Sequence, residues 1–203
     1  MSVIDPPTTD PTPSVKPGQA PPAGAQDPAA GSNKTVLLIE RMSVHYDGVE
    51  DRIALDISDA ECAVARLWLT RHGTDILVRT MAARIEAYAT TRIARANVAP
   101  GAAGPLRESA LATQQLTARL TQRSATAVAL PPGTPEHLVT GVAMPVYPGR
   151  VQLDFKCRPA LQASVRLQSA ELLQWLGALQ RQYQRAGWAQ DSWPQWFAQK
   201  GKI

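Results

Sequence analysis

The feature that most constrains the fold is a motif that occurs twice in the chain. Its first copy reads Tyr46-Asp47-Gly48 and, after a short gap, Arg52-Ile53-Ala54-Leu55-Asp56-Ile57. Its second copy is the run Tyr147-Pro148-Gly149-Arg150-Val151-Gln152-Leu153-Asp154-Phe155. An Arg-Leu pair follows each copy, first as Arg66-Leu67 and then as Arg166-Leu167. The repetition indicates two copies of one supersecondary unit.

The first unit has the pattern of three strands and a helix. The segment 36–46 begins with the apolar run 36–39 and then alternates apolar with polar residues, as 52–57 also does, which is the period of a half-buried strand. The segment 64–69 follows as a third strand. After Thr74, a residue type that caps helices, apolar side chains recur at helical spacing. Those side chains are Leu77, Met81, Ile85 and Tyr88.

The second unit repeats this order. Its strand patterns cover 137–147, 151–155 and 161–167. Pro145 predicts that the first of these strands lies at an edge or is bulged, because proline cannot donate to a strand ladder. The clearest amphipathic helix pattern of the chain follows, with Ser169 as its predicted N-cap and Gly187 placed to end it.

These patterns predict an α+β protein in which two tandem strand-strand-strand-helix repeats form one pseudo-twofold domain. A three-stranded sheet with one helix buries little apolar surface, so we expect the two repeats to share a core. The predicted segments are a disordered Pro/Ala-rich arm over 1–33, the first repeat over 34–97, a linker with a helix from Leu106 over 98–136, the second repeat over 137–187 and a Trp-rich tail over 188–203.

The composition is typical of a folded globular protein. Of the 203 residues, 44% are apolar and 19% are charged. The sequence has no run of the roughly 18 to 20 apolar residues that a membrane-spanning helix needs, and no secretory signal is recognisable. We therefore expect a cytoplasmic protein without a membrane partner. Cys62 and Cys157 form no CxxC pair and are expected to be reduced structural thiols.

Catalytic and cofactor-binding patterns are missing from the sequence. The three histidines lie far apart, and no glycine-rich phosphate loop or Walker-type lysine is present. One turn, with His45, Asp47, Glu50 and Asp51, gathers side chains that could hold a divalent ion, but a polar hairpin loop explains them equally well. The sequence therefore predicts a protein that is not an enzyme and has no metal or cofactor.

One helical stretch is rich in arginine. Its candidate contact residues are Arg79, Arg84, Arg92 and Arg95. Clustered guanidinium groups can bind phosphates or an acidic partner. The alternative interpretation is a solvated helix face with no partner.

The last segment holds most of the tryptophans of the chain. Its large aromatic residues are Trp188, Trp193, Trp196 and Phe197. Side chains of this kind are frequent anchors at interfaces, so the tail could dock into a groove of a partner. It could also fold back over its own sheet or helix, and the sequence leaves both interpretations open.

Two resemblances accompany these patterns. The run Val49-Glu50-Asp51-Arg52-Ile53-Ala54-Leu55, followed by Leu67-Trp68-Leu69-Thr70-Arg71, resembles a family of bacterial hypothetical proteins of unassigned function, over most of residues 40–190. This resemblance implies no activity. At fold level, a twofold repeat of antiparallel strands closed by a helix is similar to the repeats of the Pur-alpha and Whirly single-strand-binding proteins, which carry four strands before the helix.

We therefore expect a non-enzymatic protein that binds another protein, as an adaptor or assembly factor. The alternative is a module for single-stranded nucleic acid, which would use Arg side chains on phosphates and sheet aromatics for base stacking. Those aromatics are Tyr46, Trp68, Tyr147 and Phe155. An exposed edge strand in either repeat would also allow a homo-oligomer.

Overall fold

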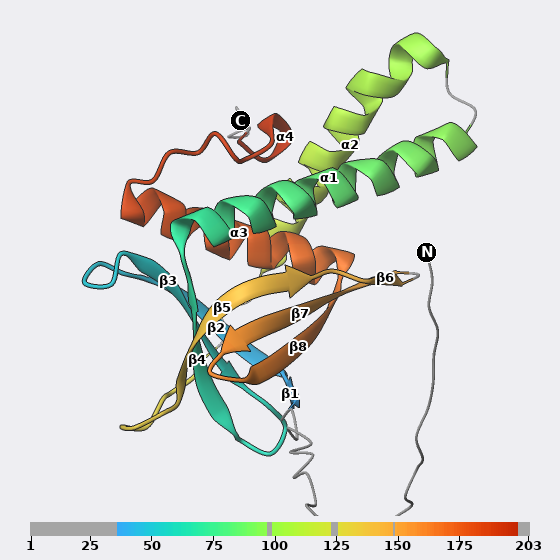
Figure 1. Ribbon diagram of the computed structural model, residues 1–203. Coiled ribbons are helices and arrows are strands. Elements are labelled where there is room, and N and C mark those ends of the chain that lie inside the picture. Colours follow the sequence, from blue (N-terminus) through green and yellow to red (C-terminus); the bar gives the residue numbers. More distant parts are fainter. Residues whose placement is uncertain (1–35, 97–98, 123–125, 148, 199–203) are drawn as a thin grey trace, which may run out of the picture. The chain divides into compact units, whose positions relative to one another are not determined.

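A computed structural model describes residues 36–96, 99–122, 126–147 and 149–198 (Figure 1). The predicted arm over 1–33 lies outside the described residues. Within them, helices and strands are both present, so the predicted α+β class is confirmed. Among the helices of these residues, none combines the length and the apolar character needed to span a bilayer.

All described strands belong to one sheet. The strands are β1 (Val36–Leu38), β2 (Arg41–Asp47), β3 (Arg52–Ser58), β4 (Val64–Leu69), β5 (Glu136–Ala143), β6 (Val146–Tyr147), β7 (Arg150–Arg158) and β8 (Leu161–Gln168). Their order is β1-β8-β7-β5-β4-β3-β2, and β6 pairs with β7 beside this path. Neighbouring strands are antiparallel except in the pairs β1–β8 and β4–β5, which are parallel.

The two ends of this strand order meet, so that the sheet is curled. The backbone N–H of Ile39 donates to the carbonyl oxygen of Ser164 in β8 at 2.8 Å. The next N–H, that of Glu40, donates to the carbonyl oxygen of Ser58 in β3 at 2.9 Å. The prediction of a single first strand over 36–46 is therefore wrong. The chain breaks there into two strands because each half of the segment pairs with a different edge.

The apolar sides of the curled sheet share one core with helix α3 (Ser169–Ala186). Ile53, Leu55 and Ile57, which alternate along β3, are completely buried, as the sequence pattern predicts. Removal of this much apolar surface from water is the main source of stability in such a domain. On α3 the buried side chains include Leu172, Leu176, Leu179 and Tyr183.

Helix α3 has well-defined ends and also covers an edge of the sheet. Its N-cap is Gln168 and not the predicted Ser169, because Gln168 forms a reciprocal capping box with Glu171. Its C-cap is the predicted Gly187, whose positive φ of 65° suits a residue without a Cβ.

Near the C-terminal end of α3, the buried Gln182 side chain accepts a hydrogen bond from the backbone N–H of Tyr46 at 3.1 Å. An N–H on the edge strand β2 is therefore satisfied within the protein.

Two further helices form a hairpin beside α3: α1 (Arg71–Arg95) and α2 (Pro100–Leu120) (Figure 1). The predicted cap at Thr74 is wrong, because Thr70 caps α1 by accepting the N–H of Gly73 at 3.1 Å. The predicted helix start at Leu106 is also wrong. Helix α2 begins at Pro100, where a missing N–H costs nothing and the fixed φ favours the first turn.

The polar side of the sheet carries a partly buried ion pair between neighbouring strands. Asp56 in β3 accepts from Nε of Arg66 in β4 at 2.7 Å, and this hydrogen bond raises the pKa of Arg66. The two residues stand opposite each other in the strand register. Arg52, four residues before Asp56 on the same strand, pairs instead with Glu50, with 3.5 Å between its Nη1 and the Oε2 of Glu50.

Each half of the chain follows the predicted order of three main strands and a helix. The third strand of the first half, β4, pairs in parallel with the first strand of the second half, β5. The third strand of the second half, β8, pairs in parallel with β1. These pairings by themselves do not confirm the predicted pseudo-twofold relation.

The two thiols differ, which gives a direct test of the core. Cys157 is buried, and burial raises its pKa to about 11, whereas Cys62 is exposed and is not the structural thiol that the sequence suggests. Because the thiolate is the reactive form, we expect a disulfide reagent at neutral pH to modify Cys62 in the native protein and Cys157 only in denaturant. Rapid modification of both thiols without denaturant would contradict the described packing.

Candidate binding groove

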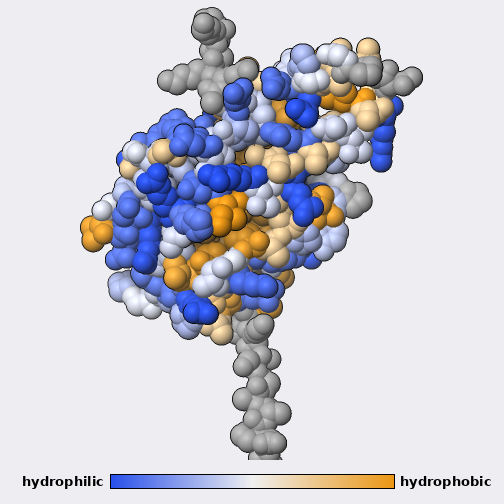
Figure 2. All heavy atoms as spheres, turned by 45° about the horizontal axis from the view of Figure 1, so that its top comes forward, coloured by the Kyte–Doolittle hydropathy of each residue, from blue (hydrophilic) through white to orange (hydrophobic). Residues whose placement is uncertain are grey.

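An open apolar groove of about 400 Å³ lies between the α1–α2 hairpin, the β5–β7 turn region and the start of α3. Its buried floor is formed by side chains from three helices. They are Met81, Leu111, Leu172 and Leu173. Because these side chains also belong to the core, the floor is fixed by the fold. The space-filling view shows apolar residues gathered among hydrophilic ones on this side of the molecule (Figure 2).

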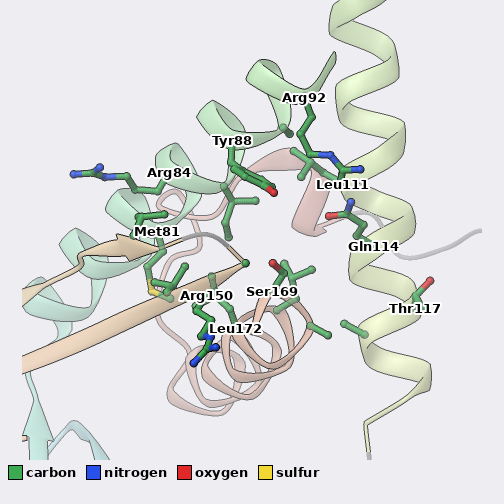
Figure 3. A pocket seen from close by; sticks show the side chains of 18 of the residues that line it. Met81, Arg84, Tyr88, Arg92, Leu111, Gln114, Thr117, Arg150, Ser169 and Leu172 are labelled. Carbon is green, nitrogen blue, oxygen red and sulfur yellow. The ribbon is translucent and has the colours of Figure 1, made fainter. Parts of the chain in front are cut away.

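Apolar and aromatic side chains continue from the floor to the rim. Tyr88 on α1 and Val146 and Tyr147 on β6 line the groove while remaining 55%, 49% and 51% exposed. Large apolar side chains on a concave surface are typical of binding sites. Figure 3 shows Tyr88 over the cavity, with Gln114 on α2 and Ser169 at the start of α3 nearby.

The charged residues of the lining are all arginines: Arg84, Arg92 and Arg150. No hydrogen bond or ion pair joins any of their guanidinium groups to another side chain among the described residues. Glu171, in the first turn of α3, is occupied by the N–H of Gln168. The groove therefore combines an apolar floor with an excess of positive charge at its rim.

The four arginines predicted as contact residues do not form one patch. Arg84 and Arg92 line the groove, but Figure 3 shows Arg84 pointing away from the cavity and Arg92 reaching toward α2. Arg79 donates from Nε to the hydroxyl of Ser192 at 3.3 Å and so contacts the C-terminal segment. Arg95 is exposed in the last turn of α1, outside the groove lining.

The Trp-rich tail is packed on the chain itself, which was one of the two interpretations that the sequence left open. Its large side chains are all buried: Trp188, Trp193, Trp196 and Phe197. The Tyr183 ring meets the rings of Trp188 and Trp193 edge-on, with centroids 5.1 and 5.4 Å apart. Such edge-on pairs add to the stabilisation from burial. These four side chains leave little surface for a partner.

Carboxylates of the first half hold the tail in place. One oxygen of Asp75 accepts hydrogen bonds from the hydroxyls of Tyr183 at 2.9 Å and Ser192 at 2.8 Å. Burial of the Tyr183 hydroxyl, and to a smaller extent its hydrogen bond to Asp75, raise the pKa of Tyr183. The indole N–H of Trp196 donates to Glu86 at 2.8 Å. Directional bonds of this kind explain why the aromatic residues dock here and do not remain exposed.

The turn that the sequence offered as a divalent-ion site is a polar hairpin loop. Asp47 accepts the N–H groups of Glu50 and Val49, which lower its pKa. Asp51 accepts from the hydroxyl of Tyr46 at 2.7 Å and from the indole of Trp188 at 3.1 Å. Within the described ranges, no three His, Cys, Asp or Glu side chains gather in a way that could hold a metal ion.

Sequence reasoning missed most of the groove. Its lining comes from α1, α2, the β5–β7 region and α3, and these segments carry no common local pattern. One signal was present. The apolar stripe of α1 continues through Ile85 to Tyr88, which is further than the sheet requires, and both residues line the groove.

Comparisons of the chain with protein-family models, with curated proteins and with solved structures found no match. The resemblances to bacterial hypothetical proteins and to the Pur-alpha and Whirly repeats stay predictions. We therefore interpret the groove from its own geometry.

Truncation of Trp188 tests the docking of the tail. We expect Trp188→Ala to lower the free energy of unfolding by about 3 to 5 kcal/mol, because a buried aromatic side chain is lost. Urea denaturation measures this change. The control Tyr88→Ala removes a half-exposed ring and should cost far less. Equal costs for the two variants would mean that the tail is not docked as described.

Asp51 gives a pH test of the same contact. Hydrogen bonds from Tyr46 and then Trp188 hold the pKa of Asp51 below its usual value of 3.8. A folded-state pKa below the unfolded one stabilises the fold above pH 3.8, and this contribution disappears as the pH falls through the folded pKa. In urea titrations, Asp51→Asn should therefore be less stable than the wild type at neutral pH, with a difference that shrinks in acid. A difference independent of pH would contradict this account.

Proposed function

We propose that the protein is a non-enzymatic binding or assembly protein that holds a segment of another protein in the groove. The observation that carries this proposal is the open groove with its buried apolar floor and half-exposed aromatic rim. Its volume of about 400 Å³ lies in the usual range of binding pockets. A cytoplasmic location is part of the proposal, and two free cysteines fit a reducing compartment.

The chemistry of the lining favours binding over catalysis. The titratable side chains that line the groove are arginines and the two tyrosines, Tyr88 and Tyr147. Arginine stays protonated in proteins and so cannot serve as a general base. Tyrosine and arginine are, however, enriched at protein interfaces, where they supply most of the binding energy.

The groove is also well prepared for a partner. Its floor side chains are held by the core, so little conformational freedom is lost when they are covered. Tyr88 and Tyr147 have few rotatable bonds and bury large areas at small entropic cost. These properties support a preformed docking site.

Binding of single-stranded nucleic acid, the alternative from the sequence, has less support. It needs exposed aromatic side chains for base stacking. Trp68 and Phe155 are buried, and the Tyr46 ring meets the Trp188 ring edge-on at 5.7 Å. Of the four candidates, Tyr147 is the exposed one.

We also propose that the two halves of the chain derive from one duplicated unit. The same sequence offset separates Arg52 from Arg150, which begin β3 and β7, and Arg71 from Ser169, which begin α1 and α3. The strand register within β3–β4 and β7–β8 is equivalent at this same offset. Agreement of strand starts, register and helix starts supports a common origin.

Site-specific photo-crosslinking tests the proposed function. A photoreactive amino acid replaces Gln114, which lines the groove, in the full chain expressed in the cells of origin. We expect a discrete protein adduct, because a docked segment would lie against this position. The matched control carries the same group at Gln184, an exposed residue outside the groove lining.

Identical adducts from both positions would contradict docking in the groove. A second test blocks the groove: Gln114→Trp fills its mouth, whereas the control Gln184→Trp does not. With the photoreactive group placed at Tyr88, the adduct should be lost in the first variant and kept in the second.

A further inference from the structure

The charged residues that line the groove all carry the same sign. The lining contains three arginines and no aspartate, glutamate, lysine or histidine. Uncompensated guanidinium groups beside an apolar surface attract carboxylates, with which arginine forms paired hydrogen bonds. A cationic segment would be repelled, so the rim selects for negative charge.

Two of these arginines are placed to act together. Arg92 belongs to the last turn of α1, and Arg150 begins β7. Figure 3 shows them on opposite sides of the cavity, Arg92 next to Tyr88 on α1 and Arg150 next to Leu172. A segment that fills the floor would therefore meet a positive charge on each flank. Arg84 points away from the cavity and takes no part in this arrangement.

The uncharged groups at the mouth favour a peptide over an acyl chain. Gln114 and Ser169 line the groove, and their side chains bond to no other side chain among the described residues. A peptide backbone supplies N–H and C=O groups for such side chains, whereas a hydrocarbon chain supplies none. The half-exposed Val146 and Tyr147 continue the apolar lining to the rim of the groove, which suits a longer ligand.

We infer that the groove recognises an acidic amphipathic peptide segment of another protein. Large apolar side chains of the segment fill the floor around Met81, Leu111 and Leu172, while carboxylates on its two flanks pair with Arg92 and Arg150. This inference rests on the proposed function and adds the chemistry of the partner to it. The net charge of +4 of the chain would also speed the approach of such a segment.

Selection from a random peptide library displayed on phage, with the immobilised full chain as bait, tests the inference. Selected peptides are synthesised, and their affinities are measured by fluorescence anisotropy at low and high salt. We expect apolar residues flanked by aspartate or glutamate, and an affinity that falls as salt rises.

Charge reversal identifies the arginines involved. Arg92→Glu combined with Arg150→Glu should weaken binding of the selected peptides by roughly tenfold to a hundredfold. The matched control reverses Arg95, on the same turn of α1, and Arg158, at the other end of β7; both lie outside the lining. This control should leave affinity within about threefold, since both charges are exposed to solvent and lie outside the groove lining. Peptides with lysine in place of the acidic residues should bind the reversed variant better than the wild type.

The outcomes separate the two proposals. If Gln114→Trp abolishes peptide binding but the reversed variant keeps it, or if the selected peptides lack acidic residues, the acidic chemistry is wrong and the proposed function stands. If no peptide is selected, or if Gln114→Trp has no effect on binding, the proposed function fails as well. Dodecanoate and a single-stranded oligonucleotide are measured in parallel, and groove binding of either one without peptide binding overturns both. Urea midpoints verify that every variant is folded.

Discussion

The closure of the sheet at Ile39 and Glu40 is the constraint on which the rest of the structure depends. Two consecutive N–H groups, between β1 and β2, donate to β8 and β3, the strands next to the two ends of the sheet. Because the segment can satisfy both edges only if they lie side by side, the sheet must curl and enclose its apolar faces. Those faces then share one core with α3, which neither half could fill alone. The unpaired edges, a common cause of aggregation, are reduced by the same closure.

The groove exists because α1 is longer than α3, although both helices start at the same closed sheet. Helix α1 has 25 residues and α3 has 18, although each begins directly after the last strand of its half. The end of α1 therefore extends beyond what the sheet supports, and α2 returns along it and packs on α3 (Figure 1). The space between the hairpin and the β5–β7 region is left open to solvent, with Leu111 and Leu172 at its base. An apolar hollow is thus built into the architecture and needs no rearrangement to form.

Local patterns predicted the parts of the fold that local forces decide. Alternation identified Ile53, Leu55 and Ile57 as core, and glycine chemistry placed the end of α3 at Gly187. The parallel pairing of β1 with β8 joins segments far apart in sequence, and periodicity carries no information about such partners. Proline and glycine between 98 and 105 suggested a linker, yet alanine propensity and packing against α1 and α3 extend the helix from Pro100. The groove was not predictable either, because its lining residues come from segments that lie far apart in the sequence.

The carboxylates that receive the tail have a consequence for biosynthesis. Asp51, Asp75 and Glu86 all lie in the first half of the chain, and each accepts a hydrogen bond from residues 183–196. When translation has delivered only the first half to the ribosome exit, these acceptors still lack the partners that the C-terminal residues supply. The native arrangement is complete only after the last aromatic residues emerge. A chain interrupted before Trp188 would consequently carry an uncovered apolar surface that cellular quality control can recognise.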